Sequence, residues 1–144
     1  MIFAIGLNIA AGVGAFAFAH LDDWIGSKPT VMISLCGLIF FGLAILMTVD
    51  KGTFMGLSLA LGIFIGPAQA ASRTLAGRLA PPGMVTQTFG LYAFTGKSVT
   101  FLGPLAYGWA TGLFESQQAG MMTIILFWMI GLLLLLDVRE KPGS

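Results

Sequence analysis

The stretch "PTVMISLCGLIFFGLAILMTV", Pro29 to Val49, decides the fold, because its 21 residues carry no charge. A helix needs about 20 apolar residues to cross the ~30 Å hydrocarbon core of a bilayer. Three more uncharged runs of 20 or 21 residues lie elsewhere in the chain, at Ile2–Leu21, Gly52–Ser72 and Ser116–Leu136. The sequence therefore predicts an all-α, polytopic transmembrane helical bundle that has the lipid bilayer as its surroundings.

The composition points to the same class of protein. Of the 144 residues, 57% are hydrophobic and 9% are charged, whereas about a quarter of the residues in a soluble domain are charged. The net charge of +1 excludes a nucleic-acid-binding footprint. The sequence has no catalytic or metal-ligand constellation, and its single histidine and single cysteine leave little for acid–base chemistry. We therefore expect neither an enzyme nor a bound cofactor.

The region between Arg78 and Glu115 needs separate treatment. It opens with a turn signal, Ala80-Pro81-Pro82-Gly83, inside which a spanning helix would not begin. From about Gln87 to Phe114 it is apolar apart from Lys97, and a division at that lysine would leave no residues for a turn. We therefore predict one long helix here, and five spans in all: Ile2–His20, Pro29–Thr48, Thr53–Ser72, Gln87–Phe114 and Gln118–Leu136, followed by a tail over residues 137–144.

The basic residues orient these spans, because Lys and Arg gather in cytoplasmic loops. With Lys97 set aside, one side of the membrane holds only Lys51. The other side holds Lys28, Arg73, Arg78, Arg139 and Lys141. This predicts a cytoplasmic C-terminus and, with five spans, an N-terminus on the outside.

An N-terminus on the outside of the membrane would have little to orient it, because no charged residue precedes the first span. Two interpretations follow. The chain is either a small five-span protein, structural or accessory, with no transport activity of its own, or the C-terminal portion of a larger transporter. We favour the larger transporter.

Glycine is frequent, at 20 of 144 residues. Small residues let helix backbones approach one another in a bilayer. We predict that two sets of glycines form close-contact helix faces: Gly6, Gly12 and Gly14 in the first span, and Gly56, Gly62 and Gly66 in the third.

The stretch "FGLYAFTGKS", Phe89 to Ser98, ends like a phosphate-binding loop. That motif needs four residues between its first glycine and the Gly-Lys pair, but five separate Gly90 from Gly96. It should also follow a hydrophobic strand, and here it follows the polar Pro-Pro-Gly turn. A nucleotide site is therefore disfavoured, and Lys97 must have another role.

The loop "AHLDDWIGSKP", Ala19 to Pro29, resembles the loop signature of the major facilitator superfamily. Four positions match, Ala19, Asp23, Gly26 and Lys28, while Trp24 and Ser27 stand where basic residues are expected. An ordinary hairpin turn with solvated charges is the alternative.

Two further blocks resemble one branch of that superfamily, the vacuolar amino-acid effluxers of autophagy and their bacterial relatives of undefined substrate. The blocks are "GIFIGPAQAASRTLAGRLAP" (Gly62 to Pro81) and "FGLYAFTGKSVTFLGPLAYG" (Phe89 to Gly108). The resemblance implies that the chain supplies the eighth to twelfth of twelve spans. It implies transport of a small solute, such as an amino acid, by alternating access together with an N-terminal bundle that this chain lacks. It also implies a bacterial inner membrane as the location.

Lys97 is the main candidate for the substrate site, because a cation near the midplane is expensive unless it faces a partner or a water-filled cavity. It could bind an anionic group, pair with a carboxylate, or extend to the membrane surface. Further substrate-binding candidates are Gln69, Tyr92 and Thr95. By the resemblance, Asp22, Asp23, Gly26, Lys28 and Arg73 form the cytoplasmic signature loop and its gate.

Overall fold

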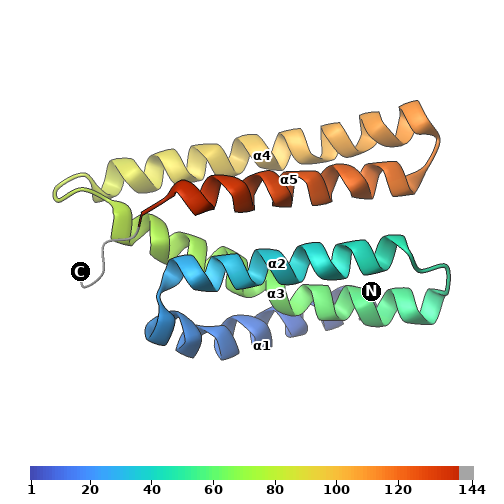
Figure 1. Cartoon of the computed structure of the whole chain (residues 1–144), viewed down its shortest axis with the longest axis horizontal. Coiled ribbons are helices and arrows are strands. Elements are labelled where there is room, and N and C mark those ends of the chain that lie inside the picture. Colours follow the sequence, from blue (N-terminus) through green and yellow to red (C-terminus); the bar gives the residue numbers. More distant parts are fainter. Residues whose placement is uncertain (140–144) are drawn as a thin grey trace.

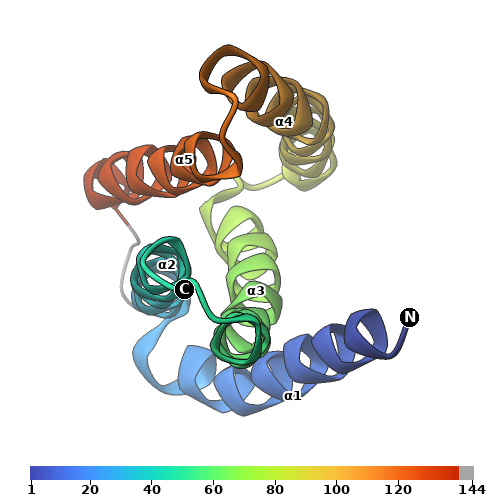
Figure 2. The same ribbon diagram turned by 90° about the vertical axis from the view of Figure 1, so that its right-hand side faces the viewer.

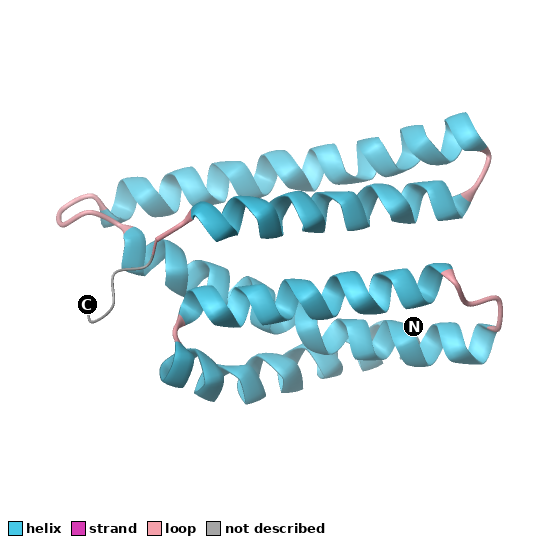
Figure 3. Cartoon of the chain, in the orientation of Figure 1, coloured by secondary structure: helices cyan, strands magenta, loops and turns pink. Residues whose placement is uncertain are grey.

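Five helices make up the described part of the chain, residues 1–139 of a computed structural model: α1 (Ile2–Ile25), α2 (Ser27–Leu46), α3 (Lys51–Leu79), α4 (Val85–Phe114) and α5 (Gln117–Asp137) (Figures 1 and 3). No strand occurs within these residues. The predicted all-α bundle is confirmed. The helices extend beyond several of the predicted spans, because the helical backbone continues through charged residues such as Asp22, Arg73 and Arg78, at which no spanning segment was expected.

Turn residues separate the helices where the sequence predicts them. Gly26 ends α1 with φ 95°, a left-handed value that favours glycine, and its N–H donates to the Asp22 carbonyl. Between α3 and α4, Gly83 has φ 81° and the Met84 N–H donates to the Pro81 carbonyl. Proline second and glycine third in a four-residue turn are typical of a type II turn.

The helices pack in the spatial order α1, α3, α2, α5, α4, and α4 also touches α3. In the end-on view, α1, α2 and α3 form one group and α4 and α5 form a second (Figure 2). The α1–α2 and α3–α4 turns lie at the same end of the bundle as the end of α5 (Figure 1). Lys28, Arg78 and Arg139 are therefore at one end and Lys51 is at the other. Lys141, in the predicted tail, lies outside the described residues.

Four helices, α1, α2, α3 and α5, are long and apolar enough to cross a membrane. The fifth, α4, has 30 residues, but its many Gly, Thr and Ser residues and Lys97 lower its hydropathy. It runs alongside α5 for much of its length (Figure 1), so a fifth span stays a prediction that this packing supports.

Glycines produce the closest helix contact, between α1 and α3. A Cβ at Gly14 would overlap the Ile63 carbonyl, and a Cβ at Gly66 would overlap the Ala11 carbonyl. Pro67 has no N–H to donate to the Ile63 carbonyl, so Gly14 lies against an oxygen that lacks its usual helical partner. This confirms the predicted contact face.

Not every glycine of the predicted faces packs in this way. Gly6 and Gly62 also face the partner helix, through Leu59 and Leu7. At Gly12 and Gly56 an added Cβ would meet nothing within 4 Å, so for these two the prediction was wrong. They lie on other sides of their helices, because helical spacing turns neighbouring glycines to different faces.

Two of the three buried polar residues of α2 are satisfied within the helix, whereas the buried Ser27 hydroxyl has no hydrogen-bond partner among the described residues. Thr30 donates to the Gly26 carbonyl at 2.8 Å and Ser34 donates to the Thr30 carbonyl at 2.9 Å.

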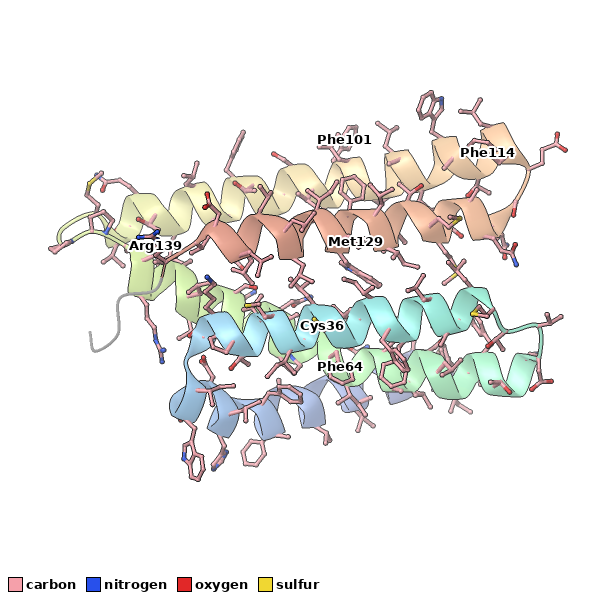
Figure 4. All side chains as sticks on the ribbon, in the orientation of Figure 1. Cys36, Phe64, Phe101, Phe114, Met129 and Arg139 are labelled. Carbon is pink, nitrogen blue, oxygen red and sulfur yellow. The ribbon has the colours of Figure 1, made fainter. Side chains whose placement is uncertain are left out.

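About two turns beyond Ser34 on α2, the Phe41 ring lies 5.7 Å from that of Phe64 of α3, between ring centroids (Figure 4). Phe64 also lies 5.8 Å from Phe18 of α1, so this packing joins α3 to both α1 and α2 and sets the face that α3 turns toward α4.

Candidate functional site

A cavity of about 610 Å³ lies between α3 and α4. Two residues one helical turn apart on α3 and six residues along one side of α4 line it: Gln69, Arg73, Phe89, Tyr92, Ala93, Gly96, Lys97 and Thr100. The α4 positions recur at intervals of three or four residues, which places them on one helix face. The loose contact between α3 and α4 leaves this space unfilled.

The cavity brings together three of the four predicted substrate-binding residues, Gln69, Tyr92 and Lys97. Thr95 is not among the residues that line it. The Thr95 hydroxyl donates to the Leu91 carbonyl of its own helix at 2.9 Å. Thr100 is the threonine of α4 that lines the cavity, and its hydroxyl likewise donates within the helix, to the Gly96 carbonyl at 2.8 Å.

Arg73 lies at the cavity and away from the signature loop with which the sequence grouped it. The third predicted span ends at Ser72, but α3 continues to Leu79, since no proline or turn residue interrupts the chain before Pro81. Arg73 therefore follows Gln69 by one turn on the same helix face. That spacing of four residues was a signal in the sequence, and it was missed because Arg73 was taken as a loop residue.

Lys97 and Arg73 are the two charged groups of the cavity, and both side chains are exposed. Within residues 1–139 neither has a hydrogen bond or an ion pair. None of the acidic residues in this part of the chain lines the cavity. The site thus presents two cations without a counter-charge from α1–α5.

The position of Lys97 along α4 indicates how deep it would lie if this helix spans the membrane as predicted. It lies 12 residues after Val85, which is ~18 Å at 1.5 Å per residue. The whole helix, at 30 residues, is ~45 Å long and matches a bilayer of about 40–45 Å including its headgroups. With α4 as a span, Lys97 is expected close to the midplane.

The predicted signature-loop residues lie together at the α1–α2 turn. Asp22 is half-buried, and its Oδ1 has no hydrogen-bond partner. Asp22, Asp23 and Thr30 line a cavity of about 150 Å³ between α1, α2 and α3. Gly26 makes the turn, and its conformation brings Lys28 to the first turn of α2.

Lys28 connects this turn to the last helix. Its Nζ donates to the Leu136 carbonyl at 3.2 Å and also to the Val138 carbonyl. The final carbonyls of a helix lack partners within it and carry a partial negative charge. Lys28 therefore caps the C-terminal end of α5, a contact that the sequence did not reveal.

Comparisons with known proteins agree with this architecture. Residues 5–144 match the family model described as "Vacuole effluxer Atg22 like". Autophagy-related protein 22 of Cryptococcus neoformans var. neoformans serotype D (strain B-3501A) is 31% identical over 94 residues, which cover 65% of this chain and 17% of that protein. Autophagy-related protein 22-1 of Penicillium rubens is 25% identical over 145 residues, which cover 89% of this chain and 24% of that protein.

The chain thus spans about a quarter or less of the length of these curated relatives. No solved structure is significantly similar to it. The relatives named here are fungal, so the bacterial inner membrane stays a prediction. The resemblance to the effluxer branch of the major facilitator superfamily is confirmed, because the family model covers nearly every residue: the chain belongs to the vacuole effluxer Atg22-like family.

Proposed function

We propose that this chain forms part of a membrane transporter for a small solute, and that the α3–α4 cavity is a substrate-binding site. The observation that carries the proposal is that Arg73 and Lys97, which have no partner within residues 1–139, line one cavity, and we place that cavity at membrane depth. Ionisable groups at this depth are retained where they serve a function, because they are costly against lipid. The family description, a vacuole effluxer, names the same class of activity for its members.

Alternating access is the proposed mechanism. Transporters of this kind bind their substrate near the midplane and expose the site to each side in turn by moving one bundle against another. We place the α3–α4 cavity at this depth, where a second bundle would complete its lining. The N-terminal bundle that this chain lacks is the partner we propose for that closure.

Replacement of Lys97 tests the proposal. In the full-length protein that carries this chain, reconstituted in liposomes, Lys97→Ala should lower solute uptake at least ten-fold while membrane abundance stays near normal. Lys97→Arg should restore uptake only in part, because a planar guanidinium does not reproduce a compact ammonium. Lys51→Ala, at the opposite end of the bundle, is the matched control and should leave uptake unchanged.

Two different outcomes would assign Lys97 a different role. Lower abundance of Lys97→Ala, restored when an acidic partner is also neutralised, would show structural pairing. Wild-type uptake by a well-expressed Lys97→Ala protein would remove Lys97 from the substrate site and indicate that its side chain extends to the membrane surface.

We also propose that the end of the bundle with Lys28, Arg78 and Arg139 faces the cytoplasm, since basic residues favour that side. Single cysteines at Pro82 and Val49, which are exposed at opposite ends, report the orientation in a Cys36→Ala background. An impermeant thiol reagent added to intact cells should label Val49→Cys and spare Pro82→Cys. The reverse pattern would invert the topology.

A further inference from the structure

The charge of the α3–α4 cavity indicates which solute it takes. We propose that Arg73 and Lys97 together bind the oxyanion end of a solute, a carboxylate in the first place, and that the site selects net-anionic over cationic molecules. This inference rests on the proposed function and adds the chemical class of the substrate. It depends on Arg73, which the helical continuation of α3 brings to the cavity.

Two cations in one cavity repel each other, and at the proposed membrane depth each is costly without a counter-charge. A bound anion removes both penalties at once. Arg73 can bind a carboxylate with two parallel N–H donors, and Lys97 adds a compact point charge. A cationic solute would find no carboxylate from the described helices in this cavity.

The depth of Arg73 and Lys97 along their helices distinguishes a water-soluble acid from a lipid headgroup as the source of the bound anion. Arg73 lies six residues before the end of α3, ~9 Å from that end, and Lys97 lies ~18 Å from the start of α4. These two helix ends meet at the same face of the bundle, through the turn that contains Gly83 (Figure 1). The phosphate of a lipid headgroup stays at the surface, so it does not reach Lys97. A water-soluble acid entering the cavity meets Arg73 first and Lys97 deeper.

The rest of the lining favours an acid with a small apolar body. Phe89, Tyr92 and Ala93 present apolar surface beside the two cations. Gly96 precedes Lys97, and a Cβ added there would meet nothing within 4 Å. A side chain at position 96 would therefore occupy space that is otherwise left for the solute.

The test uses three probes that share one skeleton and differ in charge: 3-phenylpropionate, 3-phenylpropionamide and 3-phenylpropylamine. Binding to the full-length protein is measured in phosphatidylcholine nanodiscs. The carboxylate should bind at least ten-fold more tightly than the amide, and the amine most weakly, as expected for hydrogen bonds to charged groups. Arg73→Gln and Lys97→Gln should each lower carboxylate affinity about ten-fold and leave amide affinity unchanged.

Gly96→Leu should abolish binding of the carboxylate and the amide alike, since it fills the space. Gly112→Leu is its control: it lies on the same helix, also has nothing within 4 Å of an added Cβ, and does not line the cavity. If the three probes bound with equal affinity, and Gly96→Leu abolished the binding of each, the proposed preference for anions would be wrong. The proposed function of the cavity as a substrate site would still stand. No binding of any probe to folded protein would overturn both. Loss of carboxylate binding when phosphatidylglycerol is added would assign the site to a lipid headgroup and overturn the solute assignment.

Discussion

The α1–α3 pair and helix α4 are both rich in glycine, yet the structure uses the glycines in opposite ways. Gly14 and Gly66 bring α1 and α3 into backbone contact. On α4, a Cβ added at any glycine would meet nothing within 4 Å, and none of its residues is buried. Glycine therefore allows close packing at particular positions of α1 and α3 but faces open space all along α4, and composition alone does not distinguish the two.

The difference follows from the neighbours of each helix. Helix α3 packs on both α1 and α2, and Ala71 and Leu75 are buried there with Val31. Helix α4 has α5 on one side and only a loose contact with α3 on another. Phe101 projects from α4 away from the bundle and is 71% exposed (Figure 4). The well-packed group thus acts as the scaffold, and the loosely packed α4 carries most of the cavity lining.

The largest effect is expected at the α1–α3 contact. Gly14→Leu or Gly66→Leu must push two backbones apart, so each should destabilise the purified chain at the upper end of the ~1–3 kcal/mol of overpacked cores, or prevent folding. Titration with a denaturing detergent, followed by circular dichroism, measures this.

Two glycines serve as controls for that comparison. Gly12→Leu on α1 and Gly103→Leu on α4 enter open space, and both should change stability by less than about 0.5 kcal/mol. If Gly103→Leu lowered the stability as much as Gly66→Leu, the contrast between the two regions would be wrong.

A smaller effect is expected at Lys28, which joins the α1–α2 turn to the end of α5. Lys28→Gln leaves the last carbonyls of α5 without their cation and should cost about 1 kcal/mol, since the contact is partly exposed to solvent. Lys28→Arg should retain most of the stability. Amide hydrogen exchange should show faster exchange confined to the end of α5 in Lys28→Gln; unchanged exchange there would show that the contact contributes nothing.

The smallest effect concerns Asp50, at the start of α3. The Thr53 backbone N–H and then the Thr53 hydroxyl donate to its carboxylate, and these bonds hold the pKa of Asp50 below its ordinary value of 3.8. Because its pKa is lower in the folded state, the Asp50 carboxylate contributes fully to folding stability at pH values above its ordinary pKa. This contribution is lost as the pH falls through the lowered, folded-state pKa.

Wild-type stability should therefore decline slightly below roughly pH 4 through this group. Asp50→Asn still caps the helix but has no titrating carboxylate, so the part of the decline due to position 50 should disappear. An identical pH profile for wild type and Asp50→Asn would show that the cap does not contribute.

The sequence by itself determined the class of protein, because uncharged runs of about 20 residues have no stable place except the bilayer. It also placed the turns, since Gly26 and the Pro-Pro-Gly segment act through local backbone geometry. Lys97 could be singled out from its depth alone, and the family from the residue blocks around it.

Tertiary structure alone decided which faces of the helices meet. Helical period relates Gln69 to Arg73, and Phe89 to Lys97, within each helix, but it does not say how α3 and α4 are rotated toward each other. That rotation depends on packing against α1, α2 and α5, which involves residues far apart in the chain. It places Arg73 in the cavity, leaves Thr95 out of it, and turns Gly14 toward α3 while Gly12 on the same helix faces open space.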